Sequence, residues 1–266
     1  CNINVKIPNL IINKSIIQQI MLENNKKDYQ IDRLEEYSNV IYDFLINPTS
    51  KFLLLLCPEL IKSFESQKIE KLLSEQYKLK DFKIFPNENY EKVDSDFFRG
   101  KGINEMYDFL NTKKKNKIVL ITSYETVGAG VNIQPNNITG IDLDNYININ
   151  NHLNNGYDID SLYLAMPTQL ITDVTKKNEY SIEENIKQII ALQSLLDRNL
   201  MSPIIYKKIT RNIVDSGSNI NSGIDSIHKN TIDFKNAAFA KMKQGIGRIT
   251  RTNLRNKNIN IYVSMS

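Results

Sequence analysis

Lys51–Pro58 reads KFLLLLCP, an unbroken apolar run that is closed by a proline. A strand with one face in water alternates apolar and polar residues, so an unbroken run indicates a strand buried on both faces, as in a parallel sheet. Proline cannot continue a central strand, so it marks the strand's end. The run therefore predicts an α/β fold.

Strands and helices alternate on both sides of this run. Short apolar strands are predicted at 82–85, 118–121, 161–166 and 259–263, and amphipathic helices at 60–77 and 104–110. This alternation is typical of a mainly parallel sheet covered by helices. Right-handed crossovers place the carboxyl ends of such strands along one edge, where ligands usually bind.

Two segments fall outside this rhythm. Residues 1–50 carry apolar positions at helical spacing, among them Ile31, Leu34 and Ile41, and are predicted to form a helical N-terminal extension. Residues 175–232 contain two strong helical patterns and a polar loop at 215–223, and are predicted to form a helical insertion. The α/β domain would then comprise 51–174 and 233–266.

Composition places few limits on function. The chain has 266 residues, 41% of them apolar, and a formal net charge of +4, which permits contact with phosphate without arguing for it. No apolar stretch is long enough to span a bilayer, and there is no signal-peptide pattern. We therefore expect no membrane contact and a cytoplasmic location, where a buried Cys57 would stay reduced.

Two segments could carry chemistry. Residues 121–132 read ITSYETVGAGVN, a predicted strand end followed by a small-residue turn in which glycines let the backbone approach a ligand. Residues 244–251 read QGIGRITR, in which Arg248 and Arg251 lie three positions apart and would project from one face of a helical turn. Two adjacent guanidinium groups repel each other, and a phosphate between them would stabilise the pair.

Together these segments resemble motifs V and VI of superfamily 2 helicases. Gln244, Gly247, Arg248 and Arg251 match the four positions of motif VI, and residues 123–132 resemble motif V of the Swi2/Snf2-like branch, departing from it at 124, 125 and 127. The run 51–58 resembles motif IV, and the resemblance covers about residues 35–170 and 233–265. It implies a RecA-like three-layer domain. The predicted helical insertion falls between motifs V and VI and departs from the family pattern.

The resemblance also implies roles for individual residues. Arg251 would be the arginine finger, Arg248 a second contact to the γ-phosphate, and Gln244 the link from the phosphate to the domain interface. Gly130, Asn132 and Gly247 would line the nucleotide site. Relatives touch the nucleic-acid backbone at the positions of Pro58, Ser123 and Thr126, and such contacts do not read sequence.

The sequence contains neither a GxxxxGK[ST] phosphate loop nor an Asp-Glu motif after a strand. We therefore expect the ATP cradle and Mg²⁺ to be held by an N-terminal RecA-like domain of the same polypeptide, and this chain alone neither to hydrolyse ATP nor to bind it tightly. The expected partners are DNA or RNA, that domain, and a protein partner at the insertion.

Alternative interpretations remain open. The domain could be a non-catalytic RecA-like module that docks nucleic acid or protein. A dinucleotide enzyme fits poorly, because 128–130 lacks the third glycine and an acidic residue on the next strand. No metal site is expected, since His152 and His228 are isolated and the aspartates of 142–160 lack the spacing of a calcium loop.

Overall fold

The computed structural model describes residues 2–21, 28–128, 133, 146–148, 159–165, 182–198, 201–215, 232–248 and 254–264. They divide into two compact units, Cys1–Met166 with Met242–Ser266, and Pro167–Lys241. Among the described residues, no helix is both long and apolar enough to cross a membrane.

The first unit is built on a parallel sheet in the order β1-β8-β6-β2-β4-β3. Its strands are β1 (Asn2–Lys6), β2 (Phe52–Cys57), β3 (Phe82–Phe85), β4 (Lys117–Ser123), β6 (Ser161–Leu164) and β8 (Asn258–Val263). β5 (Tyr146–Asn148) and β7 (Leu254–Asn256) form a separate antiparallel pair. The prediction of an α/β fold with a mainly parallel sheet is confirmed.

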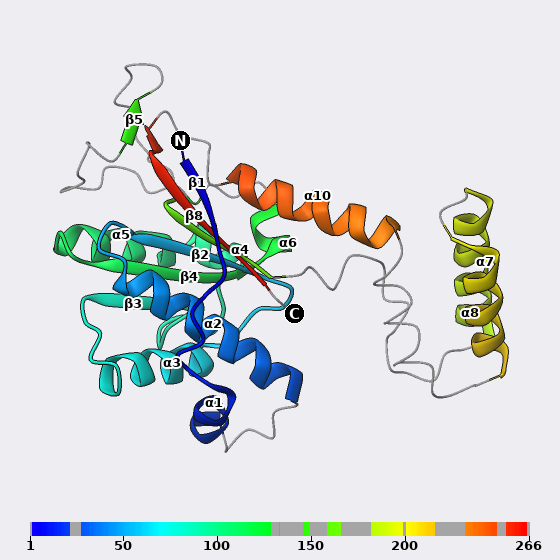
Figure 1. Ribbon diagram of the computed structural model, residues 1–266, viewed down its shortest axis with the longest axis horizontal. Coiled ribbons are helices and arrows are strands. Elements are labelled where there is room, and N and C mark those ends of the chain that lie inside the picture. Colours follow the sequence, from blue (N-terminus) through cyan, green and yellow to red (C-terminus); the bar gives the residue numbers. More distant parts are fainter. Residues whose placement is uncertain are drawn as a thin grey trace. The chain divides into compact units, whose positions relative to one another are not determined.

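Helices cover both faces of this sheet, which gives three layers consistent with a RecA-like fold (Figure 1). One face carries α1 (Lys14–Met21), α2 (Asp28–Ile46) and α3 (Ser63–Glu75), and the other carries α4 (Ser95–Arg99), α5 (Gly102–Thr112) and α6 (Tyr124–Gly128). Strand β2 supplies both cores, since Leu53 and Leu55 pack with α2 while Leu54 and Leu56 pack on the opposite face.

The prediction of a helical N-terminal extension at 1–50 is wrong in two respects. Residues 2–6 form β1, which pairs in parallel with β8 at the edge of the sheet. Helices α1 and α2 belong to the same core as β2, through side chains such as Ile17, Val40 and Phe44. Strand β1 has five residues, NINVK, most of them exposed. It therefore lacks the unbroken apolar run by which the buried strands are predicted.

The second unit contains a helical hairpin made of α7 (Ile182–Asp197) and α8 (Pro203–Asp215). Leu192, Met201 and Ile209 form its own small core. The helix α10 (Ile232–Arg248) begins in this unit and ends in the first one. The second unit therefore spans Pro167–Lys241, which is longer at both ends than the predicted insertion at 175–232.

A buried carboxyl group joins three strands at the amino-terminal edge of the sheet. Asp160 accepts hydrogen bonds from the backbone N–H groups of Lys51 (2.7 Å) and Phe52 (3.2 Å) and from the Ser161 hydroxyl (2.9 Å). The backbone carbonyl of Asp160 also accepts from the Asn260 N–H, which links β6 to β8. Burial raises the pKa of Asp160 to about 6, although these hydrogen bonds favour the ionised form.

This pKa predicts how stability depends on pH. Because the folded protein holds the Asp160 proton more tightly than the unfolded chain, whose pKa is near 3.8, the stabilisation is complete below pH 3.8 and is lost as pH rises through 6. The loss amounts to at most about 3 kcal/mol. Asp160→Asn keeps the acceptor and should remove this dependence, which urea unfolding of both proteins from pH 4 to 7 would reveal. Parallel pH profiles for the two proteins would contradict the assignment.

Candidate functional site

The carboxyl ends of three strands meet at one edge of the sheet. Cys57 of β2 lies opposite Ser123 of β4, and Leu56 of β2 lies opposite Leu164 of β6. Pro58, the predicted motif IV contact, follows directly and is buried. This edge is where an open parallel sheet most often binds ligands.

The predicted motif V turn is closed by its own hydroxyl groups. Ser123 Oγ accepts the backbone N–H of Thr126 at 3.2 Å, and the two hydroxyl groups are 3.0 Å apart. Both side chains are buried, with 6% of Ser123 and 8% of Thr126 exposed. Tyr124 donates its hydroxyl to the carbonyl oxygen of Ala165 at 2.7 Å, which fixes α6 to the end of β6.

The end of α10 packs on the same strand ends. Gly245 is buried, and a Cβ atom there would lie 2.7 Å from Leu56 Cδ1, 3.2 Å from Leu164 Cδ2 and 3.7 Å from Tyr124 Cε1. Only a residue without a side chain allows this approach of the helix to β2, β6 and α6. The described part of the predicted motif VI segment, 244–248, therefore packs through Gly245 against Tyr124 of the predicted motif V segment.

The packing leaves part of motif VI free of the core. Gln244 and Gly247 are exposed, while Met242 and Ile246 pack against the core beneath. Arg248 is the last residue of α10. Gly130, Asn132 and Arg251 lie outside the described residues. Of the predicted site residues, Pro58, Ser123 and Thr126 are therefore buried at the strand ends, while Gln244 and Gly247 are exposed on the end of α10, whose Gly245 packs there.

A loop that sequence reasoning did not single out links the predicted contacts. This loop, residues 86–93, joins β3 to α4 along the carboxyl edge. Its Val93 carbonyl accepts the Thr122 hydroxyl at 2.7 Å, next to Ser123, and its Glu91 carbonyl accepts the Ser63 N–H at 3.0 Å, at the start of α3. The loop therefore ties the end of β4 to the start of α3.

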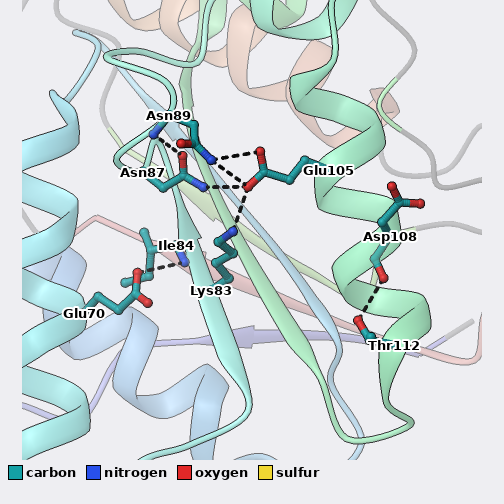
Figure 2. A network of polar contacts seen from close by, with 8 residues as sticks. All are labelled: Glu70, Lys83, Ile84, Asn87, Asn89, Glu105, Asp108 and Thr112. Atoms are coloured by element: carbon teal, nitrogen blue, oxygen red, sulfur yellow. Dashed lines mark hydrogen bonds and ion pairs between the residues drawn. The ribbon is translucent and has the colours of Figure 1, made fainter.

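Glu105 of α5 holds this loop in place (Figure 2). Its carboxylate accepts from the ammonium group of Lys83 (2.7 Å) and from the amide groups of Asn87 (3.2 Å) and Asn89 (3.3 Å). Burial opposes ionisation of Glu105, but these donors outweigh it and lower the pKa of Glu105. No short sequence motif identifies such a cluster, because its members come from a strand, a loop and a helix.

Strand β3 lies at the edge of the sheet, and the carboxyl group of Glu70 accepts a hydrogen bond from its backbone. The backbone N–H of Ile84 donates to Glu70 of α3 at 3.4 Å, as Figure 2 shows. Burial raises the pKa of Glu70. The Ile84 amide, which a side chain satisfies, is therefore not available for pairing with another strand.

Exposed side chains at the carboxyl edge carry both signs of charge. Glu59, Glu91 and Glu125 are acidic, while Lys62 and Lys92 are basic. Within the part of the chain that the structure describes, no group of three or more His, Cys, Asp or Glu side chains could hold a metal ion. The exposed side chains of this edge thus mix both signs of charge and do not form one basic face.

Comparisons with known proteins add no family to this description. No protein-family model matches the chain, and no curated protein matches it.

Proposed function

We propose that this chain is the second RecA-like domain of an ATP-dependent superfamily 2 nucleic-acid helicase or translocase. The packing of Gly245 carries the proposal, because it brings the end of α10 to the strand ends that also hold Ser123 and Thr126. This packing places the described part of motif VI next to the start of motif V, as a shared nucleotide site would require. In the proposed motor, they contact the same nucleotide and the same strand.

ATP would bind between this chain and an N-terminal RecA-like domain of the same polypeptide. Arg251 and Arg248 would face its phosphates, with Gln244 beside them, and Gly130, Asn132 and Gly247 would border the nucleotide. Arginine suits this role because its planar fork binds phosphate oxygens in pairs. Mg²⁺ would be held by the partner domain. Closure and reopening of the two domains would then move the nucleic acid.

The nucleic acid would lie over the carboxyl edge. Because the side chains of Pro58, Ser123 and Thr126 are buried, we propose that main-chain groups and exposed neighbours contact the strand there. Lys92 is such a neighbour, since it is exposed and lies between Glu91 and Val93, whose carbonyls accept from the start of α3 and from the end of β4. Contacts of this kind position a strand without reading its bases.

The proposed track predicts weak, salt-sensitive binding of single-stranded DNA or RNA to the chain alone. Lys92→Glu should weaken that binding by about fivefold to tenfold at low salt, because it replaces one phosphate contact by a repulsion. Lys115→Glu is the control, since Lys115 is exposed in the turn before β4, at the opposite, amino-terminal edge of the sheet. Fluorescence anisotropy of a labelled oligonucleotide measures both. Equal losses, or no binding by the folded chain, would contradict the proposed track.

The alternative is a RecA-like domain that docks nucleic acid or a protein without taking part in ATP hydrolysis. The burial of Pro58, Ser123 and Thr126 favours it, since these residues then serve the packing of the edge. The hairpin of α7 and α8 would be the protein-binding element in either case, and exposed Ile190 and Ile204 suit that role. A cytoplasmic location, in which buried Cys57 stays a free thiol, is proposed for both.

A further inference from the structure

A pocket of about 510 Å³ opens beside the carboxyl end of β2, on the sheet face that carries α2. Its walls are one face of α2, the loop that follows Pro58, and the first turn of α3. Leu34 and Ile61 are buried in its apolar lining, and Leu60 and Phe64 are half-buried beside them. A concave site of this size with a few polar groups is typical of small-ligand binding.

One lining residue has a hydroxyl group without a partner. Tyr37 is 2% exposed, and its hydroxyl, which lies beside the buried thiol of Cys57, has no nitrogen or oxygen partner in the part of the chain that the structure describes. Burial raises its pKa, and the nearby thiol of Cys57 adds to that effect, so the group stays a neutral donor. A buried polar group without a partner costs about 1–3 kcal/mol, which a ligand acceptor would offset.

The lining of the pocket also includes a cationic side chain, Arg33, which forms a partly exposed ion pair. Arg33 lies 3.3 Å from Glu59, and the side chains are 24% and 50% exposed. Its guanidinium also stacks 5.6 Å from the ring centre of Tyr29. A half-exposed ion pair contributes little, so an incoming anion can displace Glu59 at small cost.

The second carboxyl group of the pocket is already engaged. Glu65 is buried and accepts the backbone N–H of Lys62 at 2.8 Å, so it closes the start of α3. The groups that remain for a ligand are therefore mostly donors: the Arg33 guanidinium, the Lys62 ammonium at the rim and the Tyr37 hydroxyl. They suit a ligand that combines an aromatic or apolar body with an anionic group.

We propose that this pocket binds one nucleotide unit, with the base on the apolar lining and the phosphate on Arg33. The inference rests on the proposed function, because Glu59 directly follows Pro58, where the proposed track crosses the end of β2. Tyr37 donates its hydroxyl to an acceptor on the base or the sugar. The unit comes either from a strand on the track or from a free nucleotide.

Two titrations of the chain distinguish these sources. The δ1-methyl resonance of Ile61 is followed by NMR while a nucleoside monophosphate, and in a second sample a single-stranded oligonucleotide, is added. Movement of the resonance with both ligands, or with the oligonucleotide alone, is the expected result. Movement with the monophosphate alone supports the pocket and contradicts the proposed track. Binding of the oligonucleotide by anisotropy without movement of Ile61 overturns the pocket and leaves the track in place. No binding of either ligand overturns both.

Two substitutions of the ion pair should act in opposite directions. Arg33→Gln should weaken ligand binding at least fivefold, because it removes the phosphate contact. Glu59→Gln should strengthen binding about threefold, because it removes the competing carboxylate. Simple loss of structure would weaken binding in both variants, and that result would contradict the proposal. Arg99→Gln, at an exposed position of α4, is the control and should change nothing.

Tyr37→Phe tests the hydroxyl group separately. The variant should bind the ligand more weakly while its melting temperature is no lower than that of the parent chain, since it removes an unpartnered polar group from the core. Unchanged affinity would show that the hydroxyl does not meet the ligand and would overturn its assigned role.

Discussion

Replacing Arg251 by alanine is expected to lower the nucleic-acid-stimulated ATPase rate of the full-length polypeptide by about a thousandfold. The reason is electrostatic: an arginine finger stabilises negative charge that develops on the transferred phosphoryl group, and alanine leaves that charge without its partner. Steady-state ATP hydrolysis with saturating nucleic acid measures the effect on kcat. Affinity for nucleic acid should change little.

Two companion variants make this result specific. Arg248→Ala should also reduce the rate, because Arg248 ends α10 at the same edge. Lys243→Ala is the control, since Lys243 is an exposed cation of the same helix, five residues before Arg248, and should leave the rate unchanged. An unchanged ATPase rate in Arg251→Ala would show that Arg251 is not an arginine finger, and it would favour the docking module.

Gly245→Leu is expected to lower the free energy of unfolding by about 3 kcal/mol, the upper end for overpacking a core. Leu56 and Leu164 are fully buried or nearly so, which leaves them no free space into which to retreat from a new side chain. The end of α10 would be forced away from β2 and β6. Urea unfolding measures the loss, and a lower ATPase rate should accompany it, since the same turn carries Arg248.

Gly247 provides the opposite control in the same helix. A Cβ atom at Gly247 would meet no atom within 4 Å, and the position is exposed. Gly247→Ala should therefore stabilise the protein by about 0.5–1 kcal/mol through helix propensity. Similar effects at both glycines would mean that the close approach of α10 to the sheet does not hold the helix in place.

The buried strands of the sheet could be predicted from sequence because their signal is local. The predicted strands at 51–58 and 118–121 coincide with the apolar parts of β2 and β4, since burial on both faces favours apolar residues throughout. The edge strand β1 could not be predicted in this way. Ile3 and Val5 are exposed, and the partner that makes them a strand, β8, lies more than 250 residues away.

Some side-chain roles could not be predicted because they depend on distant partners. Lys117 ends a run of lysines that would pass for a solvated turn, yet it donates to the carbonyls of Phe44 and Leu45 and closes the end of α2. Glu105 likewise depends on a loop from a neighbouring strand. For the candidate site, the sequence pattern predicted the residues. It could not predict that Gly245 allows α10 to pack closely on Leu56 and Leu164, because that depends on tertiary structure.

A structure of the full-length polypeptide bound to nucleic acid, ADP and aluminium fluoride would test the central claim most directly. The measurement is the distance from the guanidinium groups of Arg248 and Arg251 to the fluoride that replaces the γ-phosphate. We expect both groups within hydrogen-bond distance of that ligand, across the interface with the phosphate-loop domain. Arginines buried in ion pairs within this chain and turned away from the carboxyl edge would contradict the account.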